Sequence, residues 1–256
     1  MTDDDGYFAP VVEGRDRKGD VILVCEHASN TFPAPWGDLG LTAEQRQAHI
    51  AWDPGALGVM RRLAARLDAA TISAPVSRLI YDCNRAPDTA GAMPARSELH
   101  DVPGNTALTP QERWRRCRAV YLPFQTALHS LIVERIALGR RPALITIHSF
   151  TPVYFGKRRS VEFGVIHDAD PRLAGAIFAE AEAQTSLVCG LNAPYSAADD
   201  VTHTLRLQAT PYGLDNAMLE IRNDLIATAA AEETMTDRLA PVLAAALSSL
   251  KEVPDA

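Results

Sequence analysis

At residues 21–30 the chain reads VILVCEHASN, five apolar residues followed by a polar turn. An apolar run of this length, Val21–Cys25, predicts a strand that is buried on both faces. Four more short apolar runs follow along the chain, and each predicts another strand of the same kind. They are Thr71–Ala74, Ala143–Ile147, Glu162–Ile166 and Ala217–Ile221.

Helical patterns lie between these strands. In residues 53–67 apolar side chains recur on one helical face, and Asp53-Pro54 has the form of an N-cap followed by proline in the first turn. A longer pattern covers residues 109–138, where Pro123 is expected to kink or split the helix. The alternation of strands and helices predicts an α/β fold with three layers, α/β/α, around a mostly parallel central sheet. The remaining helical patterns are residues 171–183 and 226–250, the second with a potential break near Pro241.

Charge and hydropathy narrow the classes of function. The net charge is −7, which argues against a nucleic-acid partner because phosphate binding needs a basic surface. The chain contains no run of about 18 apolar residues, so we expect no membrane span. The acidic first residues, MTDDDG, lack the apolar core of a secretory signal. A small-molecule ligand remains the expected partner, because net charge does not describe a single cleft.

Cysteine usage and length indicate where the protein acts and how it is organised. The cysteines form no CxxC pair, as expected of free thiols in the cytoplasm. With no repeat and no composition break, we expect one catalytic domain over residues 1–256, with flexible tails at 1–15 and 251–256. The four cysteines are Cys25, Cys83, Cys117 and Cys189.

Polar residues gather where the predicted strands end. His27 follows the first strand and His148 follows the third, while Glu220 and Arg222 fall at the end of the fifth. Arg85 lies a few residues beyond the second strand. Because ligands of open α/β sheets bind beyond the carboxyl ends of the strands, we expect these side chains to meet there.

These residue types suit one kind of chemistry. Two imidazoles and a carboxylate form a zinc site with an open position for water, whose pKa the metal lowers. A glutamate can pass the proton of that water to a leaving nitrogen, and arginine can hold a substrate carboxylate. The set therefore indicates amide hydrolysis. Singly, each residue also has a plainer interpretation: a hydrogen-bonded structural histidine, a turn with a surface ion pair at Asn84-Arg85, or a mutual pair of Glu220 and Arg222.

Six motifs carry a resemblance to a known family. They are CEHASN at 25–30, AWDPGA at 51–56, DCNR at 82–85, IHSF at 147–150, NAPYS at 192–196 and LEIRND at 219–224. Together they resemble the N-formylglutamate amidohydrolase family, and the likeness extends from about Val21 to Leu247. That family is in turn similar to zinc carboxypeptidases and aspartoacylases, which implies a zinc-carboxypeptidase-like fold.

The resemblance implies a role for each matching residue. His27 and His148 would hold one zinc ion, and Asn84-Arg85 would grip a substrate carboxylate. Glu220 would be the general base, and Arg222 would contact the oxyanion or the substrate.

One departure from the carboxypeptidase pattern concerns the third zinc ligand. That pattern has a glutamate three residues after the first histidine, where this chain has Asn30, whose amide oxygen is a poor zinc ligand. We expect Asp53 to be the third ligand, and Asn30, Glu26 or a weak metal site stay open as alternatives. Asn30 and His203 are further expected substrate contacts, and His203 could instead shuttle a proton.

The leading hypothesis is metal-dependent removal of a formyl or other short acyl group from an amino acid such as N-formyl-L-glutamate. Two alternatives stay open: the same machinery acting on another N-acyl amino acid or a short peptide, and a non-catalytic binder of N-acyl amino acids. Residues 157–159, Lys-Arg-Arg, predict a solvated loop from which one cation could reach an anionic substrate. The histidines with no supporting pattern are His49, His100, His129 and His167.

Overall fold

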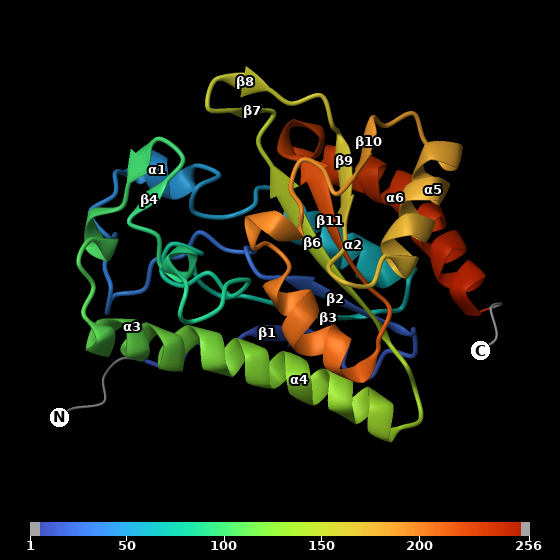
Figure 1. Cartoon of the computed structure of the whole chain (residues 1–256), viewed down its shortest axis with the longest axis horizontal. Coiled ribbons are helices and arrows are strands. Elements are labelled where there is room, and N and C mark those ends of the chain that lie inside the picture. The colour runs from blue at the N-terminus through green and yellow to red at the C-terminus, as the bar shows by residue number, and fades with distance from the viewer. Residues whose placement is uncertain (1–5, 252–256) are drawn as a thin grey trace.

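The computed structural model describes residues 6–251, in which seven strands form one central sheet (Figure 1). In sheet order they are β1 (Val11–Glu13), β3 (Ala70–Ser73), β2 (Val21–Cys25), β6 (Ala143–Phe150), β11 (Asn216–Arg222), β9 (Phe163–Ile166) and β10 (Cys189–Leu191). The α-helices are α1 (Ala43–Gln47), α2 (Ala56–Arg66), α3 (Pro110–Arg116), α4 (Leu122–Ala137), α5 (Arg172–Gln184) and α6 (Ala229–Lys251). Two small hairpins, β4 (Arg96–Ser97) with β5 (His100–Asp101) and β7 (Val153–Tyr154) with β8 (Lys157–Arg158), stand apart from the sheet.

The predicted fold class is confirmed. Strands β3, β2, β6 and β11 are parallel neighbours, whereas β1 and β9 run antiparallel to β3 and β11. All five predicted strands are present, and the third and fifth extend further than predicted, to Phe150 and Arg222. The two strands of the central sheet that sequence reasoning missed, β1 and β10, are three-residue edge strands that are not fully buried, and the two-residue hairpin strands outside the sheet were missed as well.

Alternate residues of the central strands face two separate cores, as expected for strands covered on both sides. Ile22 of β2 packs in the core that contains α4, and Leu23 packs with α2, α5 and α6. On β6, Leu144 packs in the core that contains α4, and Ile145 packs in the core that contains α2, α5 and α6. Figure 1 shows α4 along one side of the sheet and α5 and α6 along the other. His148 lies four residues after Leu144 in the same strand, so its side chain projects on the same side of the sheet, the side that α4 covers.

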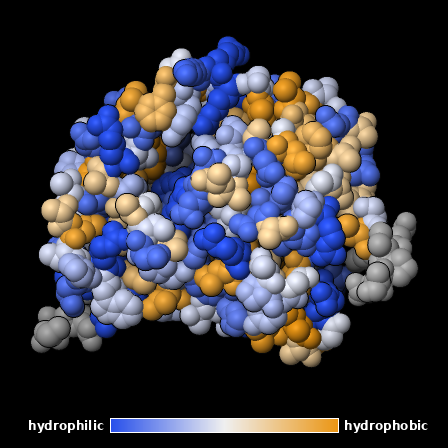
Figure 2. Space-filling model, in the orientation of Figure 1, coloured by the Kyte–Doolittle hydropathy of each residue, from blue (hydrophilic) through white to orange (hydrophobic). Residues whose placement is uncertain are grey.

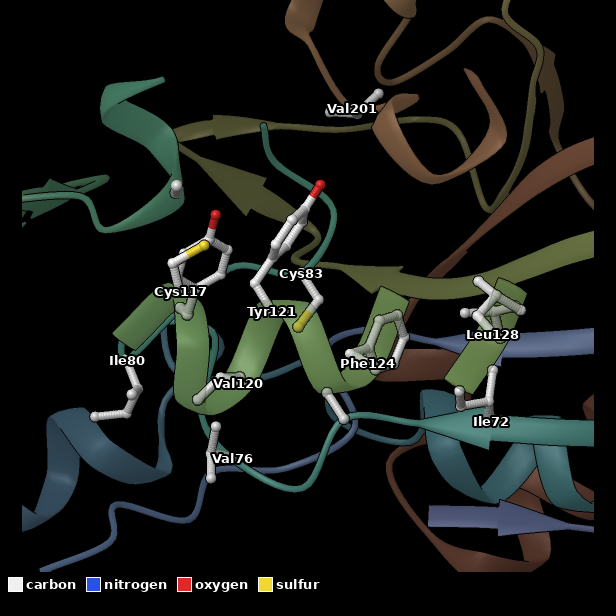
Figure 3. Packing of buried hydrophobic residues seen from close by; sticks show 14 of the residues in the cluster. Ile72, Val76, Ile80, Cys83, Cys117, Val120, Tyr121, Phe124, Leu128 and Val201 are labelled. Atoms are coloured by element: carbon white, nitrogen blue, oxygen red, sulfur yellow. The ribbon is translucent and has the colours of Figure 1, made fainter. Parts of the chain in front are cut away.

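Pro123 does not break the long helical segment. A π-helical turn, Cys117–Tyr121, connects α3 directly to α4. Proline lacks an N–H and its ring crowds the carbonyl four residues earlier, and the wider π turn just before Pro123 accommodates both effects. Figure 3 shows Val120 of this turn directed towards Val76, in the segment that follows β3, where Val76 and Ile80 are buried. Pro241 likewise lies inside an uninterrupted α6.

The start of α2 differs from the expected Asp53-Pro54 cap. Gly55 is the N-cap, in a left-handed conformation with φ of 81°. A Cβ atom on Gly55 would lie 2.4 Å from the carbonyl oxygen of Ile226, so glycine is required both for conformation and for space. The Asp53 carboxylate is thereby free to turn away from the helix, towards the ends of β2 and β6.

The prediction of a flexible N-terminal tail is partly wrong. Residues 11–13 pair with β3 as the edge strand β1, although they fall in the predicted flexible segment 1–15. Residues 1–5 and 252–256 lie outside the described residues. Within residues 6–251, no helix is both long and apolar enough to cross a membrane.

Replacing Gly55 by alanine tests whether this turn is constrained. We expect Gly55→Ala to lower the free energy of unfolding by at least about 2 kcal/mol, because left-handed strain adds to the clash with Ile226. Gly139→Ala is the matched control, since Gly139 has φ of 75° but an added Cβ would meet no atom within 4 Å. Urea unfolding measures the free energy of unfolding of both variants. Equal losses in Gly55→Ala and Gly139→Ala would show that the clash with Ile226 adds nothing to the left-handed strain.

Candidate active site

The parallel strands bring the predicted site residues to one edge of the sheet. His27 follows β2, His148 lies near the end of β6, and Glu220 lies in β11. Glu220 is the register partner of His148, so their side chains project from the same face. Asp53 joins them through its backbone N–H, which donates to the carbonyl of His27 at 2.9 Å.

Three potential ligand atoms converge. The Nδ1 atoms of His27 and His148 are 3.1 Å apart, and Oδ2 of Asp53 lies 3.2 Å from the first and 2.9 Å from the second. The N–H of Ser149 donates to the same Asp53 oxygen at 3.3 Å. All three side chains are buried, so water does not separate them from one another.

The outer nitrogens of both histidines face carboxylates. Nε2 of His27 donates to Oδ1 of Asp82 at 2.7 Å, and Oε2 of Glu26 lies 3.2 Å from Nε2 of His148. With a metal ion at the centre, each Nδ1 would present its lone pair to the ion, and each Nε2 would carry its hydrogen towards the outer carboxylate, which only accepts hydrogen bonds. Carboxylates commonly orient metal-binding histidines in this way.

Arg78 ties this carboxylate layer together. Its guanidinium donates to Oδ2 of Asp82 at 2.7 Å and to Oδ1 of Asp53 at 3.4 Å. Burial opposes ionisation of Asp82, yet His27 and Arg78 hold the pKa of that carboxyl well below its usual range. Asp53 behaves similarly: burial raises its pKa, but the two imidazoles lower it by more.

The centre carries excess negative charge. Glu26, Asp53, Asp82 and Glu220 are each at most 3% exposed, and Arg78 is the permanent cation hydrogen-bonded among them. Burial disfavours a charged imidazole, but Glu26 and Asp53 raise the pKa of His148 well above its ordinary value. The site therefore favours a positive charge between its carboxylates.

A divalent metal ion fits this centre. Three lone pairs about 3 Å apart repel one another unless a cation lies between them, and zinc bonds of about 2 Å give ligand spacings of this order. His27, Asp53 and His148 offer one nitrogen or oxygen atom each, all within 4.8 Å of one another. Their donor set of two imidazoles and one carboxylate leaves a coordination position for water or substrate.

The carboxylate of Glu220, which is not one of these ligands, also lines the cavity. Burial raises its pKa to about 7, and among the described residues its Oε2 atom has no hydrogen-bond partner. Gly164 of β9 is its other register partner, and a Cβ there would lie 2.2 Å from the carbonyl oxygen of Ala193. Glycine thus lets the 192–195 loop close over the strand beside Glu220.

A cavity of about 720 Å³ opens onto the centre. His27, Asp53, His148 and Glu220 belong to its wall, together with residues of both small hairpins. Figure 2 shows a hollow on this face, with hydrophilic residues around it, below the β7–β8 hairpin. A volume of this size accommodates a small organic substrate.

Comparison with known proteins agrees with this geometry. A family model described as N-formylglutamate amidohydrolase matches residues 19–227, which is most of the chain. The chain belongs to the N-formylglutamate amidohydrolase family. Membership of this family makes it a hydrolase that acts on amide bonds.

Two solved structures share the architecture of this N-formylglutamate amidohydrolase family member. A gene product from Agrobacterium tumefaciens is 49% identical and superposes with a TM-score of 0.94, covering 98% of this chain and 99% of that one. An N-formylglutamate amidohydrolase from Ralstonia eutropha JMP134 is 17% identical, with a TM-score of 0.69 and coverage of 96% and 99%, which shows a common fold. No curated protein sequence matches the chain.

Not every predicted substrate contact of this amidohydrolase family member lies at the cavity. Arg85 lines it and donates to the backbone carbonyls of Asp199 and Asp200. Asn84 is buried behind Arg85, where its amide donates to the carbonyl of Val201 and accepts from the N–H of Thr204. Asn84 therefore anchors the 199–204 segment.

Three other predicted residues are engaged elsewhere and do not line the cavity. Asn30 donates to the carbonyl of Arg46 and to Gln47, away from the histidines. Arg222 pairs with Glu162 and Asp224, so its guanidinium is already neutralised. His203 is buried, and its Nε2 atom lies 2.8 Å from the hydroxyl of Tyr121.

Sequence reasoning missed the residues around the ligands. Neither Asp82, which opens the DCNR motif, nor Arg78 is predicted to have a role. A signal is present, because Arg78 is the lone charge in the run APVSRLIY at 74–81 and Asp82 follows four residues later. Glu26 is expected only as an alternative direct ligand, and the structure places it against the outer nitrogen of His148.

Metal titration of variants tests the ligand assignment. We expect Asp53→Ala to weaken Zn²⁺ binding by more than about 100-fold and Asp82→Asn by about 10- to 100-fold, because the second change affects only the orientation of His27. Asn30→Ala is the control, with an affinity within about twofold of wild type. Calorimetric titration of metal-free protein measures all three, and loss of binding in Asn30→Ala would place the third ligand elsewhere.

Proposed function

We propose that this chain removes the N-formyl group, or another short N-acyl group, from an amino acid such as N-formyl-L-glutamate, with one bound Zn²⁺ ion. The observation that carries the proposal is the convergence of His27, His148 and Asp53 in a cavity that Glu220 also lines, with its Oε2 atom unpartnered among the described residues. The family name supports the substrate, since this is the activity for which the family is described.

The residues divide the work according to their positions. His27, Asp53 and His148 would hold the ion, which supplies the positive charge that lowers the pKa of water and polarises the amide carbonyl. Glu220 takes the proton of the attacking water and delivers it to the leaving nitrogen. Arg85, at the cavity wall, holds a substrate carboxylate with its remaining N–H groups.

Two alternatives remain distinct from this proposal. The cavity of about 720 Å³ has room for more than a formyl group, so another N-acyl amino acid or a short peptide is the neighbouring hypothesis. A panel of N-acyl amino acids, assayed for release of the free amino acid, separates the two. A non-catalytic binder is disfavoured by the unpartnered Glu220 carboxylate, and a zinc content below about a tenth of an equivalent after purification would favour it.

The cytoplasm is the proposed compartment. All four cysteines are free in the structure, and Cys25, Cys83 and Cys117 are buried. Free thiols are typical of proteins in a reducing environment.

Glu220→Gln is the direct test of the general base. We expect kcat for N-formyl-L-glutamate to fall by at least about 10²-fold, since the amide cannot accept the proton. Zinc content and thermal stability should stay close to wild type, because Glu220 is not among the converging ligand atoms. Near-normal turnover by the zinc-loaded variant would remove Glu220 from the mechanism.

The pH dependence of kcat/KM provides a second test. Glu220 must be ionised to act as a base, and burial raises its pKa from the ordinary 4.5 towards about 7, so activity is lost as pH falls through the raised pKa. A bound cation opposes this rise, so the acidic limb is expected above pH 4.5 and no higher than about 7. A profile that stays flat down to pH 4.5 would contradict this assignment.

A further inference from the structure

The guanidinium of Arg159 lies in a box of three aromatic rings at the cavity. Its Cζ atom is 4.3 Å from the ring centre of Tyr154, 4.8 Å from Tyr195 and 5.4 Å from Phe150. Phe150 ends β6, Tyr154 belongs to the β7–β8 hairpin, and Tyr195 follows the 192–194 turn. Arg159, Tyr154 and Tyr195 all line the cavity that contains Glu220.

Hydrogen bonds hold Arg159 in this position. Its backbone N–H donates to the carbonyl of Pro152 at 2.9 Å and closes the base of the hairpin. Its side chain donates to the hydroxyl of Tyr195 at 2.9 Å and, more weakly, to the carbonyl of Thr151 at 3.4 Å. These two bonds occupy one N–H of Nη1 and one of Nη2, so the guanidinium keeps further N–H groups for a ligand while the rings hold its position.

Arg159 has no carboxylate partner among residues 6–251, in contrast to most arginines of the same wall. Arg78 pairs with Asp82, Arg85 lies 3.6 Å from an oxygen of Asp200, and Arg96 pairs with Asp101. A half-buried, oriented and unneutralised guanidinium in a cavity is suited to a planar anion that arrives with the ligand. The overall charge of −7 makes this local cation more distinctive.

We propose that Arg159 is a specificity-determining residue, which binds the side-chain carboxylate of the substrate. This inference rests on the proposed function and deepens it by assigning the two ends of the substrate. The backbone N–H of Arg85 donates to the carbonyl of Asp82 at 3.0 Å, and Asp82 holds His27, so we assign Arg85 to the α-carboxylate beside the reacting amide. Arg159 directly follows β8 and lines the cavity, and the β7–β8 hairpin borders the hollow (Figures 1 and 2), so we assign it to the far end of the substrate side chain.

Binding measurements separate this proposal from the hydrolysis itself. The parent protein is zinc-loaded Glu220→Gln, and the probes are N-formyl-L-glutamate, its neutral isostere N-formyl-L-glutamine, and N-formyl-L-glutamate α-amide. We expect the parent to bind the glutamate at least about tenfold more tightly than the glutamine. Adding Arg159→Gln should bring the affinities for N-formyl-L-glutamate and N-formyl-L-glutamine to within about twofold of each other. The affinity for the glutamine and the preference for N-formyl-L-glutamate over its α-amide should stay unchanged.

Arg158→Gln is the matched control. It removes the same charge from the neighbouring position of the same cavity wall, but Arg158 is exposed and lacks the aromatic box, so the pair of variants tests the box and not the charge of the wall alone. The glutamate-to-glutamine ratio should stay within about twofold of the parent in this variant. Unchanged glutamine binding by Arg159→Gln also shows that the cavity is intact, which a purely structural role of Arg159 would not predict.

The outcomes are distinguishable from those of the proposed function. A glutamate-to-glutamine ratio that survives Arg159→Gln, falls equally in Arg158→Gln, or is absent in the parent overturns the role of Arg159. The role is also overturned if Arg159→Gln abolishes the preference for N-formyl-L-glutamate over its α-amide and leaves the preference over N-formyl-L-glutamine intact. Failure of the wild-type enzyme to release formate from N-formyl-L-glutamate overturns the proposed hydrolysis and leaves the binding comparison valid.

Discussion

The carboxylate of Asp53 between two imidazole nitrogens is the interaction on which the site depends. Its Oδ2 atom lies 3.2 Å from His27 and 2.9 Å from His148, and all three groups are buried. Buried groups of this kind are tolerated only where charge is balanced or a cation is bound. The strands, the turn at Gly55 and the surrounding carboxylates all act to keep these atoms together.

The cavity has an electrostatic gradient that follows from this arrangement. Asp53, Asp82 and Glu220 line it as buried carboxylates, and Glu26 lies behind them against His148. Its rim contains several arginines, of which Arg159 is held by aromatic rings in place of acidic side chains. Buried carboxylates inside the cavity and arginines around it support the proposed carboxylated amide substrate, whose neutral carbonyl would go inward and whose charged groups would stay at the rim.

Much of the fold was predictable, because apolar runs that are buried on both sides carry their own signal. The runs around Val21–Cys25 and Ala217–Ile221 became central strands for this reason. The edge strand β10 carries no such signal, since it is short and only partly buried. The effect of Pro123 was not predictable either, because the preceding residues form a π turn only when that segment packs against the buried side chains around Val76 (Figure 3).

Sequence by itself determined five strands of the sheet, the family and the positions of His27, His148 and Glu220 at strand ends, because each follows from an apolar run or a local motif. Only the tertiary structure decided that Asp53 and not Asn30 meets the histidines, since this depends on a backbone hydrogen bond between residues 53 and 27. The aromatic box of Arg159 likewise joins segments that are far apart in sequence. Local patterns specify which elements form, whereas the approach of loops from different strands specifies which side chains share a site.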